Sequence, residues 1–302
     1  MNKFVDPKAL SRVKDLPLAA KTLAQGFLQG LHSSMQRGVG IEFSQYRIYE
    51  PGDDLSKIDW KLFARSDKYF VREAERESDI NVWFVLDSST SMLQNSDVNS
   101  ETSEWNKLEY ARYLIGTSAY IAQKQGDNVG FLSLSSNIQR YLPALSGERH
   151  WQKILLSLTK VKAIDSFPKP EQVLNQLGNM QNNGVIFVIS DFHQKNNEIV
   201  NLVRQLSNSR TDVVTIQLTC EDEETFPYKG AVRFEDLETK EQVLVSANQI
   251  RESYFDSKLK YQTNLTSDLA KVKAHHFIAN IDKPLDQTLF DILTMRNKRV
   301  LK

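Results

Sequence analysis

The chain has 302 residues, of which 40% are hydrophobic and 25% are charged, as in an ordinary globular protein. Basic and acidic residues both number 38, so no net charge favours nucleic acid or an anionic membrane surface as a partner. Cys220 is the single cysteine, which excludes a disulfide within the chain and, with only five histidines, argues against a zinc site. The amino terminus lacks the apolar core of a signal peptide, and no apolar run reaches the ~18 residues of a membrane helix. We therefore expect a cytoplasmic protein without membrane insertion.

Residues 1–37 predict a helical extension at the amino terminus. Leu23, Phe27 and Leu31 recur at four-residue steps, as on one face of a helix, and Pro17 suits a first turn. Residues 32–38 are polar and basic, which favours a connector.

Residues 38–77 form a second region, rich in aromatic residues and in charges of both signs. Residues 50–54, Glu-Pro-Gly-Asp-Asp, are a strong turn pattern. Residues 68–77 alternate in polarity and predict a strand. We interpret the region as a small β-rich segment packed on the core of the protein.

From residue 78 to residue 302 we expect one domain with an elaborated carboxyl-terminal part. Five consecutive apolar residues, Val82 to Leu86, are typical of a strand buried on both faces. Strands and helices then alternate, which predicts an α/β, doubly wound fold with a mostly parallel sheet and helices on both faces. The other strands are expected at 129–134, 185–190 and 213–218, and the helices near 108–122, 151–158, 173–177 and 199–206.

The texture of the sequence changes after Cys220. The acidic run at residues 221–224 favours a solvated loop, with a partner contact as the alternative. Residues 231–234 and 242–245 predict a short hairpin. Two helices, at about 247–273 and 284–297, are expected to flank a strand at 276–279.

Polar side chains follow the apolar strand at 82–86 in the pattern Asp87-x-Ser89-x-Ser91. Ligands collect at the carboxyl ends of parallel strands, and these hard oxygen donors suit Mg²⁺. Asp191 ends a second apolar run and can close the site from a neighbouring strand. The pattern thus indicates a Mg²⁺ (or Mn²⁺) site, or else a helix N-cap with a structural ion pair.

These residues resemble two known patterns. The strand end with the later Ser190-Asp191 resembles the metal-ion-dependent adhesion site of von Willebrand factor type A domains. The preceding window is similar to the domain-of-unknown-function 58 family, and the resemblance runs from about residue 38 to about residue 297. The window contains the motifs Gly40-Ile41-Glu42-Phe43, Arg47-Ile48-Tyr49, Pro51-Gly52-Asp53-Asp54, Ile58-Asp59-Trp60 and Ala64-Arg65.

The resemblance implies a von Willebrand factor type A-like fold and a role for individual residues. Asp87, Ser89 and Ser91 would be ligands from the first metal loop, and Asp191 would be the acid of the third loop, acting through water. Such an ion keeps an open coordination position that an acidic side chain of a partner can fill. No general base is needed for this kind of binding.

The second metal loop departs from the related domains, which place a threonine there. Residues 161–168 contain no threonine, and Ser166 is the nearest chemical substitute, with Asp165 as the alternative. This departure leaves a structural scaffold with a vestigial metal site as a second reading of the chain.

Charged residues of alternating sign lie in the window at residues 40–65. They form either a buried ion-pair lattice that joins this segment to the sheet or a surface that binds a partner. These charged residues are Arg47, Asp53, Asp54, Asp59 and Arg65.

The family resemblance also implies a partner. Similar proteins are often encoded beside MoxR-type AAA+ ATPases, which implies an adaptor or co-chaperone role, with other von Willebrand factor type A proteins as further partners.

An enzyme is the less favoured class. Phosphoryl transfer of the haloacid dehalogenase type also starts from a strand-terminal aspartate, but Ser89 stands where that chemistry needs a second acid. The balanced charge and the sparse acids near the motif disfavour a nuclease. The chain also lacks the glycine-rich nucleotide loop of P-loop proteins. We therefore expect a metal-dependent protein-binding module without catalytic activity.

Overall fold

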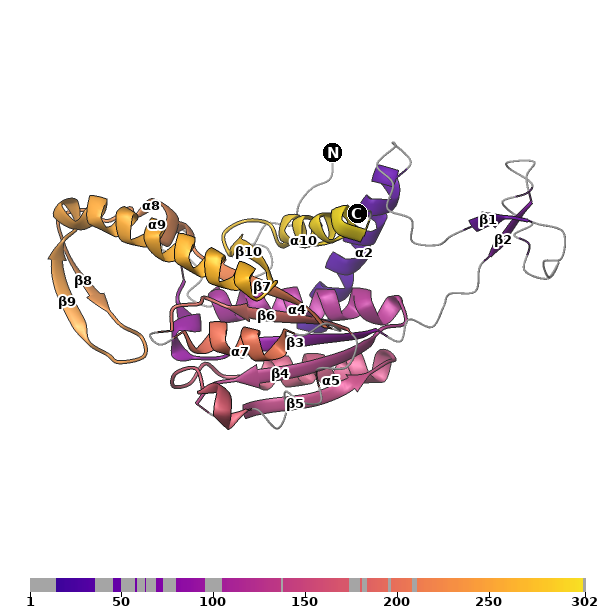
Figure 1. The fold of residues 1–302 in the computed structure, drawn as a ribbon, viewed down its shortest axis with the longest axis horizontal. Helices are drawn as coiled ribbons and strands as arrows, with labels where there is room; N and C mark the ends of the chain where they lie inside the picture. Colours follow the sequence, from indigo (N-terminus) through magenta and orange to yellow (C-terminus); the bar gives the residue numbers. More distant parts are fainter. Residues whose placement is uncertain are drawn as a thin grey trace.

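The computed structural model describes residues 15–35, 46–49, 58, 63, 69–72, 80–95, 105–136, 138–173, 180, 184–194, 197–207 and 211–300. Within these ranges, six strands form a sheet in the order β10-β7-β6-β3-β4-β5 (Figure 1). The strands are β3 (Asn81–Asp87), β4 (Asn128–Leu134), β5 (Ile138–Leu145), β6 (Gly184–Ser190), β7 (Thr211–Thr219) and β10 (His275–Asn280). All neighbours pair in parallel except β4 and β5. The predicted α/β class with a mostly parallel sheet is confirmed, whereas the antiparallel edge strand β5 was not predicted.

The sheet is buried on both faces because side chains of a strand alternate between them. In β3, Val82, Phe84 and Leu86 belong to one apolar core, and Trp83 and Val85 belong to the other. The first core includes side chains of α2 (Leu16–Met35), α4 (Lys107–Lys124), α5 (Glu148–Lys160) and α10 (Leu285–Val300). The second core includes side chains of α7 (Glu198–Leu206) and α9 (Ala247–Lys271). Helices thus cover both faces, as expected.

Helix α2 differs in extent from the prediction. It continues to Met35, so the connector expected from residue 32 is wrong for residues 32–35. No proline or glycine interrupts residues 31–37, so nothing in the sequence stops the helix there. Leu16, Ala20 and Leu23 are buried in the first core. The helix is therefore part of the packing of the domain.

The acidic run at residues 221–224 is also not the solvated loop that was expected. It forms the short helix α8 (Glu221–Thr225), in which Asp222 is buried. The Glu223 carboxylate accepts a hydrogen bond from the backbone N–H of Cys220 at 3.0 Å, which closes the first turn. Acidic side chains in a first turn also interact favourably with the helix dipole.

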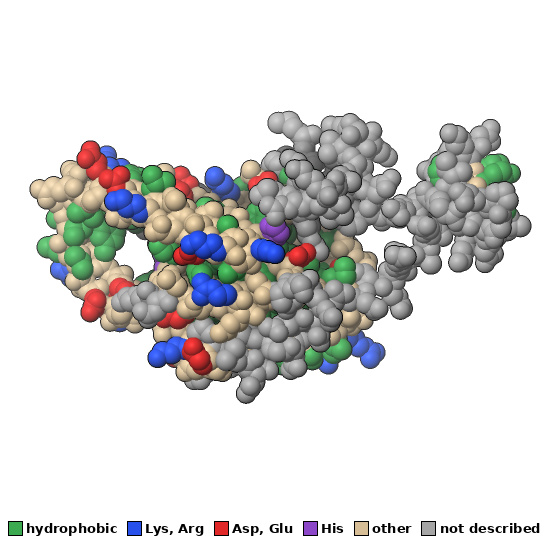
Figure 2. All heavy atoms as spheres, in the orientation of Figure 1, with side chains coloured by type: hydrophobic (Ala, Val, Ile, Leu, Met, Phe, Trp, Pro, Cys, Tyr) green, Lys and Arg blue, Asp and Glu red, His purple; other side chains and the backbone are tan. Residues whose placement is uncertain are grey.

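The carboxyl-terminal elements are confirmed. The hairpin consists of β8 (Ala231–Glu235) and β9 (Gln242–Ser246), and α9, β10 and α10 follow. Figure 2 shows apolar side chains gathered where the hairpin and α9 meet, while charges of both signs are interspersed over the rest of the described surface. Val243, Leu244 and Leu259 are among the exposed apolar residues of this part.

Two predicted regions are described only in part. Strands β1 (Tyr46–Ile48) and β2 (Phe70–Arg72) pair antiparallel, and Figure 1 draws them apart from the six-stranded sheet. Packing of residues 38–77 on the core therefore stays a prediction. Of the helix expected at 173–177, only Val173 is described, directly after the 3-10 turn η4 (Pro170–Gln172). Among the described helices, none has the length and apolar character that a membrane span requires.

Candidate functional site

Asp87 and Ser190 end two neighbouring parallel strands, β3 and β6, and their side chains meet at the edge of the sheet. One carboxylate oxygen of Asp87, Oδ2, accepts hydrogen bonds from Ser190 Oγ at 2.6 Å and from Gln194 Nε2 at 3.0 Å. The other, Oδ1, accepts from the backbone N–H of Ser89 at 2.8 Å. The side chain is 1% exposed, so this carboxylate is buried and held by three donors.

The two hydroxyls predicted for the first loop lie together. Ser89 is extended, with φ −68° and ψ 163°, and precedes the 3-10 turn η2 (Thr90–Leu93). The turn places Ser89 Oγ and Ser91 Oγ 3.0 Å apart. Ser89 is buried and Ser91 is half-buried, so the pair extends from the carboxylate toward the surface. Hydrogen bonds thus link the three predicted first-loop residues, from Ser89 to Asp87 and between Ser89 and Ser91.

Asp191 follows β6 and is fully buried. Its Oδ1 atom accepts a hydrogen bond from the backbone N–H of His193 at 3.2 Å, whereas Oδ2 has no hydrogen-bond partner. A buried acceptor without a partner calls for an explanation, such as a water or an ion. Burial, together with the neighbouring charge of Asp191, raises the pKa of Asp87 to about 7. Asp87 and Asp191 are therefore electrostatically coupled from adjacent strand ends.

The second loop reaches the first loop through Asp165. The backbone carbonyl of Asp165 accepts hydrogen bonds from the N–H of Thr90 at 2.8 Å and from its hydroxyl at 2.9 Å. The carboxylate of Asp165 accepts from Ser136 Oγ at 2.6 Å, and the residue is in the left-handed region with φ 55°. Ser166 is exposed. Asp165 is also exposed, and it contacts the first loop through its backbone carbonyl, so a ligand role for the side chain of Ser166 or Asp165 stays a prediction.

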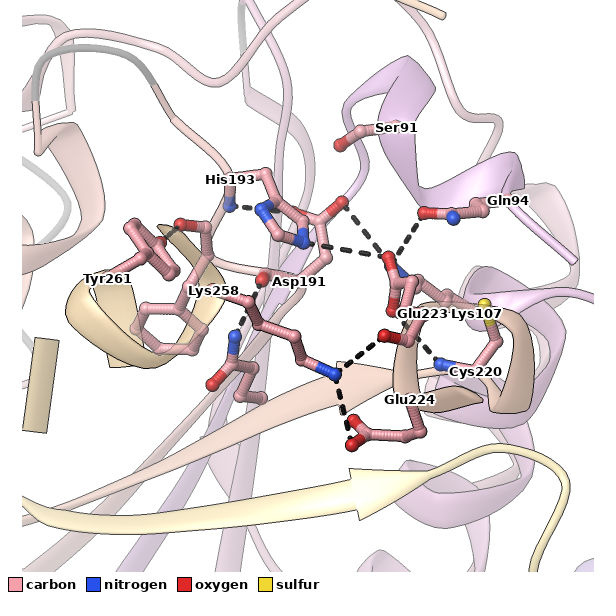
Figure 3. Close-up of polar contacts among 12 residues, drawn as sticks. Ser91, Gln94, Lys107, Asp191, His193, Cys220, Glu223, Glu224, Lys258 and Tyr261 are labelled. Atoms are coloured by element: carbon pink, nitrogen blue, oxygen red, sulfur yellow. Dashed lines mark hydrogen bonds and ion pairs between the residues drawn. The ribbon is translucent and has the colours of Figure 1, made fainter. Parts of the chain in front are cut away.

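A buried lysine, Lys107, was missed by the sequence reasoning. It stands in the first turn of α4 and is 0% exposed. Its Nζ atom lies 2.8 Å from Glu223 Oε1, 2.9 Å from Gln94 Oε1 and 3.9 Å from Asp191 Oδ2 (Figure 3). Lys107 lies four residues before Ala111 on the buried face of the helix, and this periodicity was the available indication.

The Lys107–Glu223 pair is charged on both sides. Burial opposes the charged form of Lys107, but the carboxylates of Glu223 and Asp191 outweigh it and raise the pKa of the lysine. Burial likewise opposes the charged form of Glu223, and the Lys107 ammonium outweighs it and holds the pKa of Glu223 well below its usual range. The site therefore contains a resident cation next to Asp191.

A pocket of about 250 Å³ lies beside this pair, between α8, α9 and the end of β7. Glu223 belongs both to the pocket wall and to the lysine pair. Figure 3 shows Tyr261 and His193 on one side and Lys258 and Glu224 on the other. The lining residues are His193, Gln217, Thr219, Glu223, Tyr254, Ser257, Lys258, Tyr261 and Gln262. The volume is below the roughly 300–1,000 Å³ of drug-sized ligand sites.

The residues at the strand ends fit a hard divalent cation. The donor set has two carboxylates, of Asp87 and Asp191, and two hydroxyls, of Ser89 and Ser91, all of them oxygens of the kind that Mg²⁺ prefers. The partnerless Oδ2 atom of Asp191 is a further argument for a missing polar ligand. Within the described residues there is no group of three or more His, Cys, Asp or Glu side chains that could hold a metal ion, so the hydroxyls of Ser89 and Ser91 would have to complete the donor set.

The predicted partner-binding residues lie largely beyond what the structure describes. Arg47 is in strand β1, whereas Asp53, Asp54, Asp59 and Arg65 lie outside the described residues. Their proposed lattice or partner surface therefore stays a prediction.

Comparisons with known proteins place the chain in a family. A model of the family described as protein of unknown function DUF58 matches residues 45–264. Uncharacterized proteins of Mycobacterium bovis and Mycobacterium tuberculosis are each 25% identical to the chain over 248 residues, which is 78% of this chain and 72% of theirs. Among solved structures, the fold is similar to the conserved hypothetical protein BatB of Bacteroides thetaiotaomicron (15% identity, TM-score 0.43, 71% of this chain and 99% of that chain). It is also similar to an aerotolerance-related membrane protein of Bacteroides fragilis (17% identity, TM-score 0.46, 72% and 99%). Because the family model spans more than half of its residues, the chain belongs to the DUF58 family of proteins of unknown function.

Proposed function

We propose that this protein is a non-catalytic, metal-dependent protein-binding module with a von Willebrand factor type A-like domain. It acts as an adaptor or co-chaperone for a MoxR-type AAA+ ATPase. The observation that carries the proposal is the convergence of hard oxygen donors at the ends of β3 and β6, with one buried carboxylate oxygen, Asp191 Oδ2, left without a hydrogen-bond partner.

In this proposal Asp87, Ser89 and Ser91 hold Mg²⁺ or Mn²⁺, and Asp191 contributes through a water molecule. When bound, the ion supplies an open coordination position for a carboxylate of the partner. Ser91 is half-buried and lies at the outer end of the donor set, so a partner side chain can approach from this side. The pocket beside Glu223 has room for a neighbouring side chain of the same partner segment.

The contacts of Asp87 support binding rather than catalysis. Its carboxylate already accepts from Ser190, Gln194 and the backbone of Ser89, so it is fixed in place as a ligand. Ser89 is hydrogen-bonded to Ser91 and stands where haloacid dehalogenase-type chemistry needs an acid. A protein-binding role needs neither a general base nor a nucleophile at this position.

A scaffold with a vestigial metal site is the second candidate, and one observation favours it. The Lys107 ammonium lies 3.9 Å from Asp191 Oδ2 and offsets part of the negative charge that would otherwise attract a metal. In that case the strand ends would be held together without any ion, and partner binding would not respond to a chelator.

The test is a binding assay between the full chain and the MoxR-type ATPase, in Mg²⁺ and in EDTA. Ser89→Ala removes one donor, and Ser253→Ala, an exposed serine of α9, is the matched control. We expect EDTA and Ser89→Ala to weaken binding by about 2–5 kcal/mol, because the partner's carboxylate loses its counter-charge. Ser253→Ala should bind like the wild type. Binding that is unchanged by both EDTA and Ser89→Ala would refute the metal-dependent mechanism.

A further inference from the structure

Lys107 lies at a position where a lysine destabilises the fold unless oxygen atoms close by interact with its ammonium. A cation in the first turn of a helix opposes the helix dipole, and burial of a lysine without partners is costly. Here the ammonium is fully buried, and the oxygens near it come from Glu223, Gln94 and Asp191. Gln94 follows the turn that carries Ser91, and its backbone carbonyl also accepts from the N–H of Lys107 at 3.1 Å. Lys107 therefore connects the first metal loop to the third.

The two carboxylates near Lys107 have different relations to it. Glu223 Oε1 is within hydrogen-bond distance at 2.8 Å, whereas Asp191 Oδ2 is at 3.9 Å, too far for a hydrogen bond. Asp191 is thus neutralised by the ammonium through space while its Oδ2 atom keeps its hydrogen-bonding capacity. Glu223 is itself held by the backbone N–H of Cys220 at 3.0 Å, with His193 Nε2 at 3.6 Å.

We infer that Lys107 is a built-in competitor of the divalent cation, and that Glu223 limits this competition by holding the ammonium away from Asp191. The inference rests on the proposed metal-dependent function, and it concerns how strongly the site binds the ion. The ammonium stabilises Asp191 when no ion is bound, and it repels an ion that approaches the same carboxylate. The pair thereby sets a weak affinity, which suits an ion that is retained only when a partner's carboxylate completes its shell.

The net charge around the ion predicts the order of Mg²⁺ affinity among the variants. Lys107→Met removes one positive charge and should tighten Mg²⁺ binding by about tenfold, since like charges repel strongly at low effective dielectric constant. Glu223→Gln removes one negative charge, frees the ammonium to approach Asp191, and should weaken binding by about tenfold. The double variant Lys107→Met/Glu223→Gln removes one charge of each sign and should bind like the wild type.

Isothermal titration calorimetry of Mg²⁺ and Mn²⁺ into the full chain, with circular dichroism as the check of folding, tests this order. If Lys107→Met fails to fold, the comparison of Glu223→Gln with the double variant decides, because these two differ only at Lys107. The inference is supported if the double variant binds about tenfold more tightly than Glu223→Gln. The inference is overturned if Lys107→Met and Glu223→Gln both weaken Mg²⁺ binding. A merely structural role of the pair predicts that result, because either change would then disturb the site.

The outcomes also separate this inference from the proposed function. If the wild type binds Mg²⁺ and Lys107→Met binds it equally, the inference fails while metal binding stands. If the wild type binds no Mg²⁺ but Lys107→Met does, the competition is supported and metal dependence of the wild type fails. If none of the variants binds the ion, both are overturned.

Discussion

Replacing Lys107 by methionine should destabilise the fold even in the absence of metal. The side chain is 0% exposed, and that of Glu223 is 13% exposed, so the variant leaves the Glu223 carboxylate in a nearly dry site without its cation. Breaking one side of a buried ion pair costs about 3–5 kcal/mol. For a chain of this size, about 2 °C per kcal/mol gives a fall in melting temperature of ~6–10 °C.

The assay is urea unfolding at pH 7 in EDTA, so that bound metal does not contribute to the free energy of unfolding. Glu223→Gln and the double variant complete a double-mutant cycle, which isolates the energy of the pair from other effects of each change. We expect the double variant to be more stable than Lys107→Met, because it has no uncompensated carboxylate at position 223. A Lys107→Met variant within about 1 kcal/mol of the wild type, or a coupling energy near zero, would show that the Lys107–Glu223 pair does not stabilise the fold.

Four further predictions concern Asp87, the register of the sheet and the pocket beside Glu223. Because burial and the charge of Asp191 raise the pKa of Asp87 to about 7, protons should compete with Mg²⁺ for this carboxylate. The affinity for Mg²⁺ should rise about tenfold per pH unit up to pH 7 and level off above it. Calorimetry between pH 5.5 and 8.5 measures this affinity, and a flat profile would contradict the prediction. The same raised pKa means that, without metal, the folded state loses stability as the pH rises from about 4 to 7, and Asp87→Asn should remove this slope in urea unfolding. A methyl group at Gly184 would lie 2.0 Å from a backbone oxygen of β3, so Gly184→Ala should lower the free energy of unfolding in urea by about 1–3 kcal/mol. Gly26 has open space around it, so Gly26→Ala should stabilise α2 by about 0.5–1 kcal/mol. Equal effects of the two changes would argue against the register of the sheet. Ser257→Trp should fill the pocket and weaken binding of the ATPase without changing Mg²⁺ affinity, whereas Ser267→Trp, on the same helix and outside the pocket wall, should do neither; wild-type binding of the ATPase by Ser257→Trp would exclude the pocket from the interface.

The sequence was sufficient for the elements whose pattern lies within one short segment of the chain. The apolar run at Val82 to Leu86 identified a strand buried on both faces, and the oxygens of Asp87, Ser89 and Ser91 follow it as predicted. The spacing of apolar residues on one helical face predicted α4, and two apolar segments around a turn predicted the hairpin of β8 and β9. Each of these signals lies within one short segment, so each element could be recognised without knowledge of the fold.

The parts that were missed depend on contacts between distant segments. Lys107 and Glu223 are 116 residues apart, and either alone reads as a surface residue. Only the packing of α8 against the start of α4 makes them a buried pair. Strand β5 was missed because its exposed and half-buried residues do not form an apolar run. The choice between Ser166 and Asp165 likewise depends on the direction of each side chain, which no spacing specifies.

In the proposed function, the strand ends of β3 and β6 hold a divalent cation through Asp87. The most direct test is calorimetric titration of Mg²⁺ into the wild type and Asp87→Ala at pH 8, where Asp87 is ionised, with thermal unfolding as the check that both proteins are folded. We expect saturable binding to the wild type and no measurable binding to the folded Asp87→Ala variant. Equal binding by the two proteins, or no binding by the wild type, would contradict it.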